Sequence, residues 1–270
     1  MLVAWTVPIA WGQAKGFRPP PNYITTGKPD QAEGARILSE FHRAGISGTY
    51  WLGFQLRVMP RNGAETTVPG EMIGTQNGQG PLRRLSIGEQ RWLIQAGSQP
   101  ATWTAEGTST SRQMSAAQTL EPLAGTDLTV FDLQMPFFYW TDFVYEGLAR
   151  IRGRPAHSFV LYPPPDLAAA RPGLTGVRIL VDTQFQALMQ AELLGPKGTV
   201  EKTISILDLK KVGDYWIPKS IDFRNHLTRG KTRFEVGAAA LELTLPAGVF
   251  EPAGLSALSP KVPPDKIQKL

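Results

Sequence analysis

The feature that most constrains the fold of this chain is an apolar side chain at every second position, repeated through many short segments from about position 47 to position 245. In the clearest segment the apolar side chains are Tyr50, Leu52, Phe54, Leu56 and Val58. Alternation with a period of two gives a β-strand one apolar face and one mixed face. The pattern therefore predicts a β-sheet built from many strands.

Turn sequences between these segments predict how the strands pair. Asn62-Gly63, Asn77-Gly78 and Gly88-Glu89 each separate two strand-like segments, and such pairs favour tight hairpins. Each strand should therefore pair with its sequence neighbour in an antiparallel sheet. We expect later strands at 144–151, 156–162, 177–182, 187–194, 199–209, 215–223, 233–236 and 239–245, with a proline and alanine linker at 163–173. About ten or eleven strands with few helices predict a mainly β (α+β) fold, with one curved sheet or barrel.

A Gly-Lys-Thr sequence at 230–232 has the composition of a phosphate-binding loop. Such a loop has a further glycine where this chain has Asn225, and it joins a strand to a helix. Here the residues that follow, Arg-Phe-Glu-Val, alternate as in a strand. We therefore interpret Thr228-Arg229-Gly230-Lys231 as the tip of a β-hairpin, in which Gly230 can adopt a positive φ.

One segment has a clear helical period. Asp30 and Glu33 predict a capped start, and Gly45 can close the C-terminal end. The apolar positions of this helix are Ala35, Ile37, Leu38, Phe41 and Ala44. The sequence therefore predicts one amphipathic helix with one buried face.

The strand pattern is interrupted between about 111 and 143. Thr126 or Asp127 is placed to cap a short helix, and Pro136 should end it. The next residues, Phe137, Phe138, Tyr139 and Trp140, form an aromatic block. We interpret Asp127 as a helix-start residue and Asp132 as a solvated or locally bonded carboxylate.

The N-terminal residues have features of an export signal. The apolar run at 2–11 is too short to span a bilayer, and Gly12-Gln13-Ala14 suits cleavage after Ala14. A buried strand or helix is the alternative, because no basic residues precede the run. We expect a signal-peptide remnant at 1–14, an extended lead-in at 15–29, one domain at 30–257 and a C-terminal tail at 258–270.

Composition and spacing argue against several classes of protein. The chain has no cysteine, and its net charge of +5 is spread along the sequence, so neither a thiolate site nor nucleic-acid binding is expected. His42, His157 and His226 lie in separate elements without metal-ligand spacing, and no nucleophile-elbow sequence is present. We therefore expect a protein that is not an enzyme and that needs no cofactor or metal.

Aromatic residues are the remaining feature, with seven Trp, twelve Phe and six Tyr. They can fill an ordinary core. They can also line an apolar cavity between a curved sheet and its helices, where each buried methylene group of a lipid contributes roughly 0.8 kcal/mol. The sequence leaves both interpretations open.

Several phrases in the second half of the chain resemble the outer-membrane lipoprotein-sorting protein family, relatives of the periplasmic carrier LolA. These phrases are "GTDLTVFDL" at 125–133, "ARIRGRPAHSFVLYPP" at 149–164, "VRILVDTQFQALMQAELLGPKGTVEKTISI" at 177–206, "VGDYWIPKSIDFRNHLTRGKTRFEV" at 212–236 and the closing "LPAGVFEPAGL". The resemblance extends over about residues 30–255. It implies an unclosed antiparallel β-barrel, a half-barrel, with helices as a lid over a hydrophobic cavity for lipid.

The resemblance also suggests local roles. Asp127 and Asp132 match the Gly-Thr-Asp…Asp-Leu phrase of the family, which implies the entry to a lid helix. The sequence Tyr215-Trp216-Ile217-Pro218 matches a Tyr-Trp-x-Pro hairpin, which implies a strand that sets the sheet curvature. No functional arginine of the carrier can be matched to this sequence.

These observations lead to the hypothesis of an exported periplasmic carrier that binds a lipid or an acylated lipoprotein. Its expected protein partners are membrane donor or receptor proteins. We expect its cavity to be lined on the sheet side by Leu52, Phe54, Leu56 and Trp92, and on the lid side by Phe137, Phe138, Tyr139 and Trp140. One alternative is an envelope-sensing module that binds a membrane protein through the same fold. Another is a hydrolase, for which carboxylates converging on His157 would be the sign.

Overall fold

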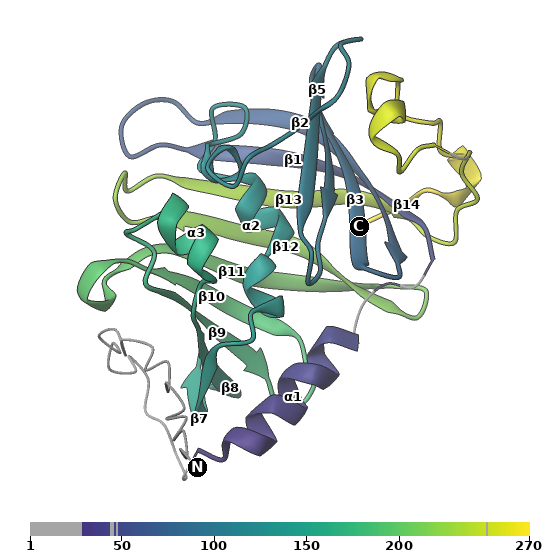
Figure 1. The fold of residues 1–270 in the computed structure, drawn as a ribbon. Coiled ribbons are helices and arrows are strands. Elements are labelled where there is room, and N and C mark those ends of the chain that lie inside the picture. Colours follow the sequence, from purple (N-terminus) through teal and green to yellow (C-terminus); the bar gives the residue numbers. More distant parts are fainter. Residues whose placement is uncertain (1–28, 44–45, 47, 247) are drawn as a thin grey trace, which may run out of the picture.

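The computed structural model describes residues 29–43, 46, 48–246 and 248–270, which form one antiparallel sheet with a few short helices (Figure 1). The strands are β1 (Tyr50–Met59), β2 (Thr66–Asn77), β3 (Gly80–Ile87), β4 (Gln90–Gln95), β5 (Ala101–Glu106), β6 (Arg112–Gln113), β7 (Phe143–Ile151), β8 (Arg154–Leu161), β9 (Gly176–Asp182), β10 (Leu188–Leu194), β11 (Val200–Val212), β12 (Tyr215–Asn225), β13 (Lys231–Ala240) and β14 (Gln268–Lys269). The helices are α1 (Gln31–Arg43), α2 (Val130–Gln134) and α3 (Pro165–Ala170), with 3₁₀ turns η1 (Gln118–Leu120), η2 (Pro136–Tyr139), η3 (Pro196–Gly198), η4 (Pro252–Ser256) and η5 (Pro264–Lys266).

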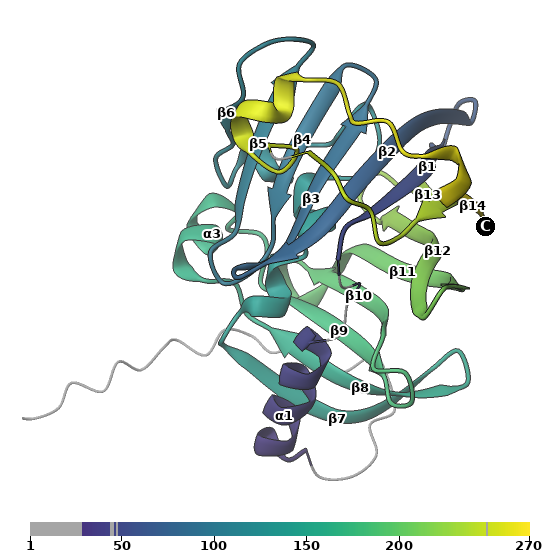
Figure 2. The ribbon, with the colours of Figure 1, turned by 90° about the vertical axis from the view of Figure 1, so that its right-hand side faces the viewer.

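The sheet is strongly curved but does not close. Its strand order is β6-β5-β4-β3-β2-β1-β13-β12-β11-β10-β9-β8-β7, with β14 attached to β13. Thus β6 and β7 follow each other in sequence but form the two opposite edges. The chain between them crosses the concave side of the sheet (Figures 1 and 2). The expected mainly β fold, an unclosed antiparallel barrel with helices, is confirmed.

The pairing of β1 with β13 joins the two halves of the sheet and places their apolar faces together. Leu52, Phe54 and Leu56 of β1 are buried, as the alternation predicts. The ring of Phe54 stacks on that of Phe234 in β13, with ring centroids 4.2 Å apart. Side chains from strands far apart in the sequence therefore share one core on the concave face.

The structure contains more strands than the ten or eleven expected. The sequence patterns did not predict β5, β6 or β14. Strands β6 and β14 have only two residues each, and β14 is defined only by pairing with distant Ala238 and Ala239. The separate strand expected at 239–245 does not form. Instead, β13 continues to Ala240, and Glu242 then adopts a φ of 53°. The sheet therefore has 14 strands among the described residues.

The helix expected near 30–44 is confirmed as α1. The Asp30 carboxylate accepts a hydrogen bond from the backbone N–H of Ala32 at 2.9 Å, but Glu33 bonds to Arg36 and does not complete a capping box. The proposed signal remnant, most of the lead-in and Gly45 lie outside the described residues. The linker expected at 163–173 contains α3, because proline is well tolerated in the first turn of a helix.

Gly70 provides a test of the packing on β2. It lies opposite Phe54, and a Cβ atom at this position would be 2.4 Å from Phe54 Cζ and 2.9 Å from the backbone oxygen of Ser86. Because the backbone oxygen cannot move aside easily, Gly70→Ala should lower the free energy of unfolding by about 1–3 kcal/mol. Urea denaturation monitored by tryptophan fluorescence would measure this change.

The matched control is Gly78→Ala, in the turn between β2 and β3. A Cβ atom at Gly78 would meet no other atom within 4 Å, so the unfolding midpoint should hardly change. Equal losses at Gly70 and Gly78 would show that the clash does not control stability. Phe54→Leu in the Gly70→Ala background should restore part of the loss, since it removes the nearest ring atoms.

Candidate functional site

The segment between β6 and β7, residues 114–142, forms a lid over the concave face of the sheet (Figure 1). It contains η1, α2 and η2. Helix α1 packs beside it, and the rings of Phe41 in α1 and Phe138 in η2 have centroids 4.7 Å apart. The lid and α1 together therefore cover the apolar face of the curved sheet.

The side chains predicted to line a cavity meet in one apolar cluster. The sheet contributes Leu52, Phe54, Leu56 and Trp92, and the lid contributes Phe137, Phe138 and Trp140, with Tyr139 partly buried against them. Leu56 and Phe137 are each 0% exposed, so the interface is filled by the protein's own side chains. The resemblance implied a cavity at this place, but in this structure the lid is packed down onto the sheet.

The aromatic block has a compact local structure that presses its rings toward the sheet. Helix α2 ends at Gln134, Met135 adopts the left-handed conformation with a φ of 48°, and Pro136 begins η2. The expectation that Pro136 ends the helix is confirmed. The ring centroid of Phe137 lies 4.8 Å from that of Phe138 and 6.2 Å from that of Trp140.

A groove of about 560 Å³ lies where the sheet splits beside this cluster. Strands β12 and β13 pair only from Ser220 to Arg224, and beyond this part β13 pairs with β14. Phe54, Val236 and Leu270 contribute apolar walls to the groove, together with polar residues from β11 and β12. Of the side chains predicted to line a cavity, Phe54 is the one that borders this groove.

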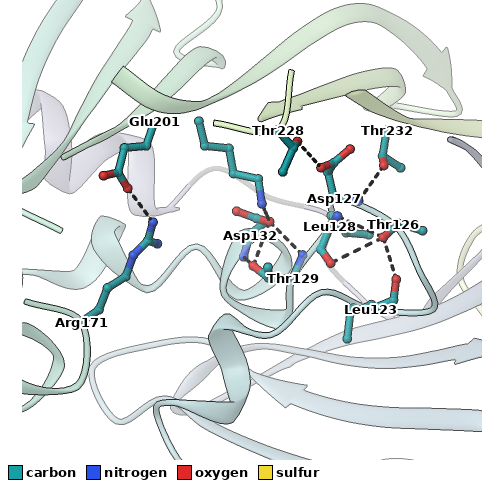
Figure 3. Close-up of polar contacts among 11 residues, drawn as sticks. Leu123, Thr126, Asp127, Leu128, Thr129, Asp132, Arg171, Glu201, Thr228 and Thr232 are labelled. Carbon is teal, nitrogen blue, oxygen red and sulfur yellow. Dashed lines mark hydrogen bonds and ion pairs between the residues drawn. The ribbon is translucent and has the colours of Figure 1, made fainter. Parts of the chain in front are cut away.

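Two polar contacts attach the middle of the lid to β13 and the β12–β13 loop (Figure 3). The backbone N–H of Asp127 donates to the hydroxyl of Thr232 on β13 at 2.9 Å. The hydroxyl of Thr228, in the β12–β13 loop, donates to the Asp127 carboxylate at 3.2 Å. The predictions that Thr126 or Asp127 caps α2 are wrong, because the cap is Thr129 and Thr126 bonds to Leu123 in the preceding turn.

A second attachment is made by Asp132, which is completely buried. Its Oδ2 atom accepts hydrogen bonds from the backbone N–H and the hydroxyl of Thr129, each at 2.8 Å, within a reciprocal capping box. Lys202 Nζ on β11 donates to the same oxygen. Asp132 is thus locally bonded, as expected, but it is not solvated. We call Asp127, Asp132, Lys202, Thr228 and Thr232 the polar latch.

Sequence reasoning missed Lys202, although the sequence contains a signal for it. Lys202 occupies the position in β11 that alternation assigns to the same face as Ile204, which is buried in the core. A lysine on such a face needs an anionic partner, because an unpaired buried charge is costly. That partner could not be identified from the sequence, because Asp132 lies 70 positions away.

The hairpin expected at 228–231 is confirmed, but its glycine has a different role. The loop connects β12 to β13, and Arg229, not Gly230, adopts the positive φ, at 62°. Gly230 is needed for space, because a Cβ atom there would lie 2.7 Å from Oδ2 of Asp127. The glycine of the Gly-Lys-Thr sequence therefore allows the lid to approach the hairpin.

His157, the residue on which the hydrolase alternative depends, and Glu146 on β7 both make structural contacts. His157 Nδ1 is 2.8 Å from the hydroxyl of Tyr145 on the neighbouring strand, and His157 does not line the groove beside Phe54. Glu146 accepts from Ser158 at 2.7 Å and pairs with Arg178 at 3.2 Å. Across the described part of the chain, no group of three or more His, Asp or Glu side chains is arranged to hold a metal.

His157 should make the stability depend on pH. Burial lowers the pKa of His157 below its ordinary value, against a smaller opposing effect of the Glu33 charge. The unfolded chain then binds a proton more readily than the folded one, so the free energy of unfolding should fall as the pH drops from about 6.5 toward the folded pKa. Thermal denaturation between about pH 8 and pH 5 would measure this slope.

The variant His157→Gln should flatten this slope relative to the unchanged protein. His226→Gln is the matched control, because His226 is an exposed histidine that bonds to Thr203. Its slope should stay close to that of the unchanged protein. If both variants flatten the slope to the same extent, His157 is not the group responsible.

Comparison with known proteins places the chain in a family. A family model described as "Uncharacterized protein" matches residues 106–257, more than half of the sequence. The chain belongs to this family. The match begins at the end of β5 and continues through the lid and the second half of the sheet, so the polar latch lies within it. A comparison with curated proteins finds no match.

Solved structures show that the fold of this family member is LolA-like. A DUF1329 family protein from Desulfovibrio piger has a TM-score of 0.73 at 13% identity, over 85% of this chain and 100% of that chain. A structure described as an outer membrane lipoprotein-sorting protein domain, from Vibrio parahaemolyticus, has a TM-score of 0.71 at 15% identity, over 83% and 97%. A LolA superfamily protein from Nitrosomonas europaea has a TM-score of 0.61 at 14% identity, over 83% and 98%.

These similarities confirm the fold that the resemblance implied. At such low identities they show the fold alone, and they do not transfer a ligand or a partner to this chain. Within the described residues, no helix is both long enough and apolar enough to span a membrane.

Proposed function

We propose that this protein is a periplasmic carrier that binds the acyl chains of a lipid or a lipoprotein between the sheet and the lid. Binding and release occur by movement of residues 114–142 away from the concave face. The cargo then passes to a membrane receptor, in the manner of outer-membrane lipoprotein sorting. The LolA-like fold supports this proposal, since one similar structure is described as a lipoprotein-sorting domain.

The observation that carries the proposal is the contrast between the two kinds of contact under the lid. The lid meets the sheet through aromatic and aliphatic side chains, including Phe137 and Leu56, which have no directional bonds to break. Its polar attachments include the contacts of the polar latch, a backbone hydrogen bond from Met114 N–H to the oxygen of Thr102 on β5 at 2.8 Å, and two hydrogen bonds near the end of α2. In those two bonds, Gln134 donates to the backbone oxygen of Gln95 at 2.8 Å and Arg83 donates to that of Leu133 at 3.3 Å.

An apolar interface of this kind can exchange partners at little cost. When the lid lifts, its apolar side chains and those of the sheet lose their mutual contacts. An acyl chain can replace these contacts, with roughly 0.8 kcal/mol gained for each methylene group removed from water. The ligand-binding side chains under this proposal are those of the closed apolar cluster: Leu52, Phe54, Leu56, Trp92, Phe137, Phe138, Tyr139 and Trp140.

Native mass spectrometry with lipid extraction tests the proposal directly. The protein should be purified from the periplasm without detergent, and then analysed before and after denaturation. A bound phospholipid or acylated peptide that is released on denaturation supports the carrier function. Uptake of a fluorescent fatty acid by the emptied protein would show that the site is reversible.

The alternative outcomes are informative. An empty protein that also fails to take up a fluorescent fatty acid would overturn the proposal, because the aromatic side chains would then be simply core. Stoichiometric co-purification of a membrane protein without lipid would favour the envelope-sensing alternative. Failure to recover the protein from the periplasm would contradict the proposed location, independently of lipid binding.

A further inference from the structure

A second groove, on the convex face of the sheet, gathers basic side chains that the lid site does not use. It has a volume of about 310 Å³ and lies over β11, β12 and β13. It is lined by Arg152, Thr203, Ser205, Leu207, Asp222, Arg224, His226 and Lys231. We call it the convex groove.

Strand alternation separates the convex groove from the apolar cluster. Thr203 and Ser205 flank Ile204, whose side chain is 0% exposed in the core. Asp222 likewise precedes Phe223, which is also fully buried. Because neighbouring residues of a strand point to opposite faces, the convex groove and the lid site use opposite sides of the same strands.

The one carboxylate in the convex groove is already neutralised. Asp222 accepts from Arg233 Nε at 2.6 Å and from Arg233 Nη2 at 3.1 Å, and Lys231 Nζ lies 3.3 Å away. Burial alone would raise the pKa of Asp222, but the hydrogen bonds and charges of Arg233 and Lys231 lower it below its ordinary value. Arg233 thus balances Asp222, and the groove keeps an excess of positive charge from Arg152, Arg224 and Lys231.

Several of the lining groups are hydrogen-bond donors held by the fold. Arg152, in the β7–β8 turn, donates to the backbone oxygen of Ile206 at 2.9 Å, which fixes its guanidinium beside β11. The hydroxyl of Thr203 lies 2.8 Å from His226 Nε2. Arg224 is exposed at the groove. Guanidinium, ammonium and hydroxyl donors at one place form a set that suits the oxygens of a phosphate group.

We propose that the convex groove binds a phosphate group, carried by a lipid headgroup or by a soluble phosphate compound. Two apolar side chains lie at its border: Leu207, which lines the groove and is 42% exposed, and Leu227, which follows His226 and is 72% exposed. Such a border permits contact with a lipid surface. This site is independent of the acyl site under the lid.

The test uses the full-length protein and two probes. Inorganic phosphate is titrated by calorimetry at constant ionic strength against chloride, and binding to equimolar phosphatidylglycerol and phosphatidylcholine vesicles is measured by flotation. We expect saturable phosphate binding that weakens about tenfold in Arg224→Gln, since a charge-assisted hydrogen bond is lost. Arg112→Gln, an exposed arginine on β6 at the sheet edge, is the matched control and should bind like the unchanged protein.

Each outcome decides a point. If phosphate displaces the protein from vesicles and Arg224→Gln weakens both interactions, the phosphate group belongs to a lipid headgroup. If the protein binds inorganic phosphate but does not bind the vesicles, the ligand is a soluble phosphate compound. If phosphate does not bind, or Arg112→Gln has the same effect as Arg224→Gln, the site is overturned. Thermal denaturation of each variant confirms that the fold is intact.

Discussion

A disulfide between the lid and the β12–β13 loop is expected to slow acyl exchange. Thr228 Oγ1 and Asp127 Oδ1 are 3.2 Å apart, so the two side chains face each other and their positions are the natural places for a pair of cysteines. A disulfide holds the two segments together by a covalent bond and so restrains the open state, and the uptake and release of a fluorescent fatty acid should slow by at least about tenfold. Stopped-flow fluorescence on the double variant Asp127→Cys/Thr228→Cys would measure both rates.

The unchanged chain has no cysteine, so any effect of oxidation must come from the two introduced cysteines. Adding a reductant to the same sample should restore the original rates, and each single cysteine variant should be insensitive to oxidation. Unchanged rates in the oxidised double variant would mean that the part of the lid around position 127 does not move during binding. Acyl chains would then have to enter elsewhere, for example through the split beside Phe54.

The second large effect is expected at the ion pair between the lid and β11. The variant Lys202→Met leaves the Asp132 carboxylate buried without its cation, although Thr129 still donates to it. Breaking a buried ion pair from one side typically costs about 3–5 kcal/mol, so the urea midpoint should fall by a corresponding amount. Because the lost contact belongs to the polar latch, the variant should also bind fatty acid faster than the unchanged protein.

Two companion variants test the reason for this loss. The double variant Asp132→Asn/Lys202→Met should recover part of the stability, because a neutral amide can still accept from Thr129 and no unpaired charge remains, although the amide N–H groups replace a buried Oδ1 atom that has no hydrogen-bond partner. Lys231→Met removes a partly exposed lysine from Asp222 on the convex face and should cost less than about 1 kcal/mol. A similar loss for Lys202→Met and Lys231→Met would show that burial of the pair is unimportant.

These two experiments test whether the lid moves during binding or is a fixed part of the core. The disulfide restrains opening without removing a buried contact, whereas Lys202→Met removes a contact without restraining the chain. If the lid gates the site, fatty-acid uptake should be slower in the disulfide variant and faster in Lys202→Met. A protein whose lid is a fixed part of the core would lose stability with Lys202→Met but would show no opposite change in uptake.

Much of the sheet follows from the sequence because its determinants are local. The alternation in β1 assigned Leu52, Phe54 and Leu56 to one face, and the glycine-containing turns at 63 and 78 placed the first hairpins. Asp30 and the helical period likewise located α1. In each case the signal lies within a few residues, since one strand or one turn decides which side chains are buried.

The site was predicted less completely, because its geometry depends on residues distant in the sequence. The eight predicted lining side chains do meet in one apolar cluster, but the sequence could not show that they fill the space between them. Asp127 was assigned to a helix start from its neighbours, whereas its partners Thr228 and Thr232 come from more than 100 positions away. The short strand β14 was not predicted for the same reason, because its pairing partners Ala238 and Ala239 are distant in the sequence.

A long antiparallel sheet, an amphipathic helix before it and an aromatic interruption of the strand pattern all follow from the sequence alone. The position of the interruption across the concave face depends on the fold, because the pairing of β1 with β13 puts β6 and β7 at opposite edges and the chain must pass between them. Only the tertiary structure joined Asp132 to Lys202. Hydrophobic alternation predicts which face of a strand is buried, but it does not predict which two charged side chains, distant in the sequence, pair in the low-dielectric interior.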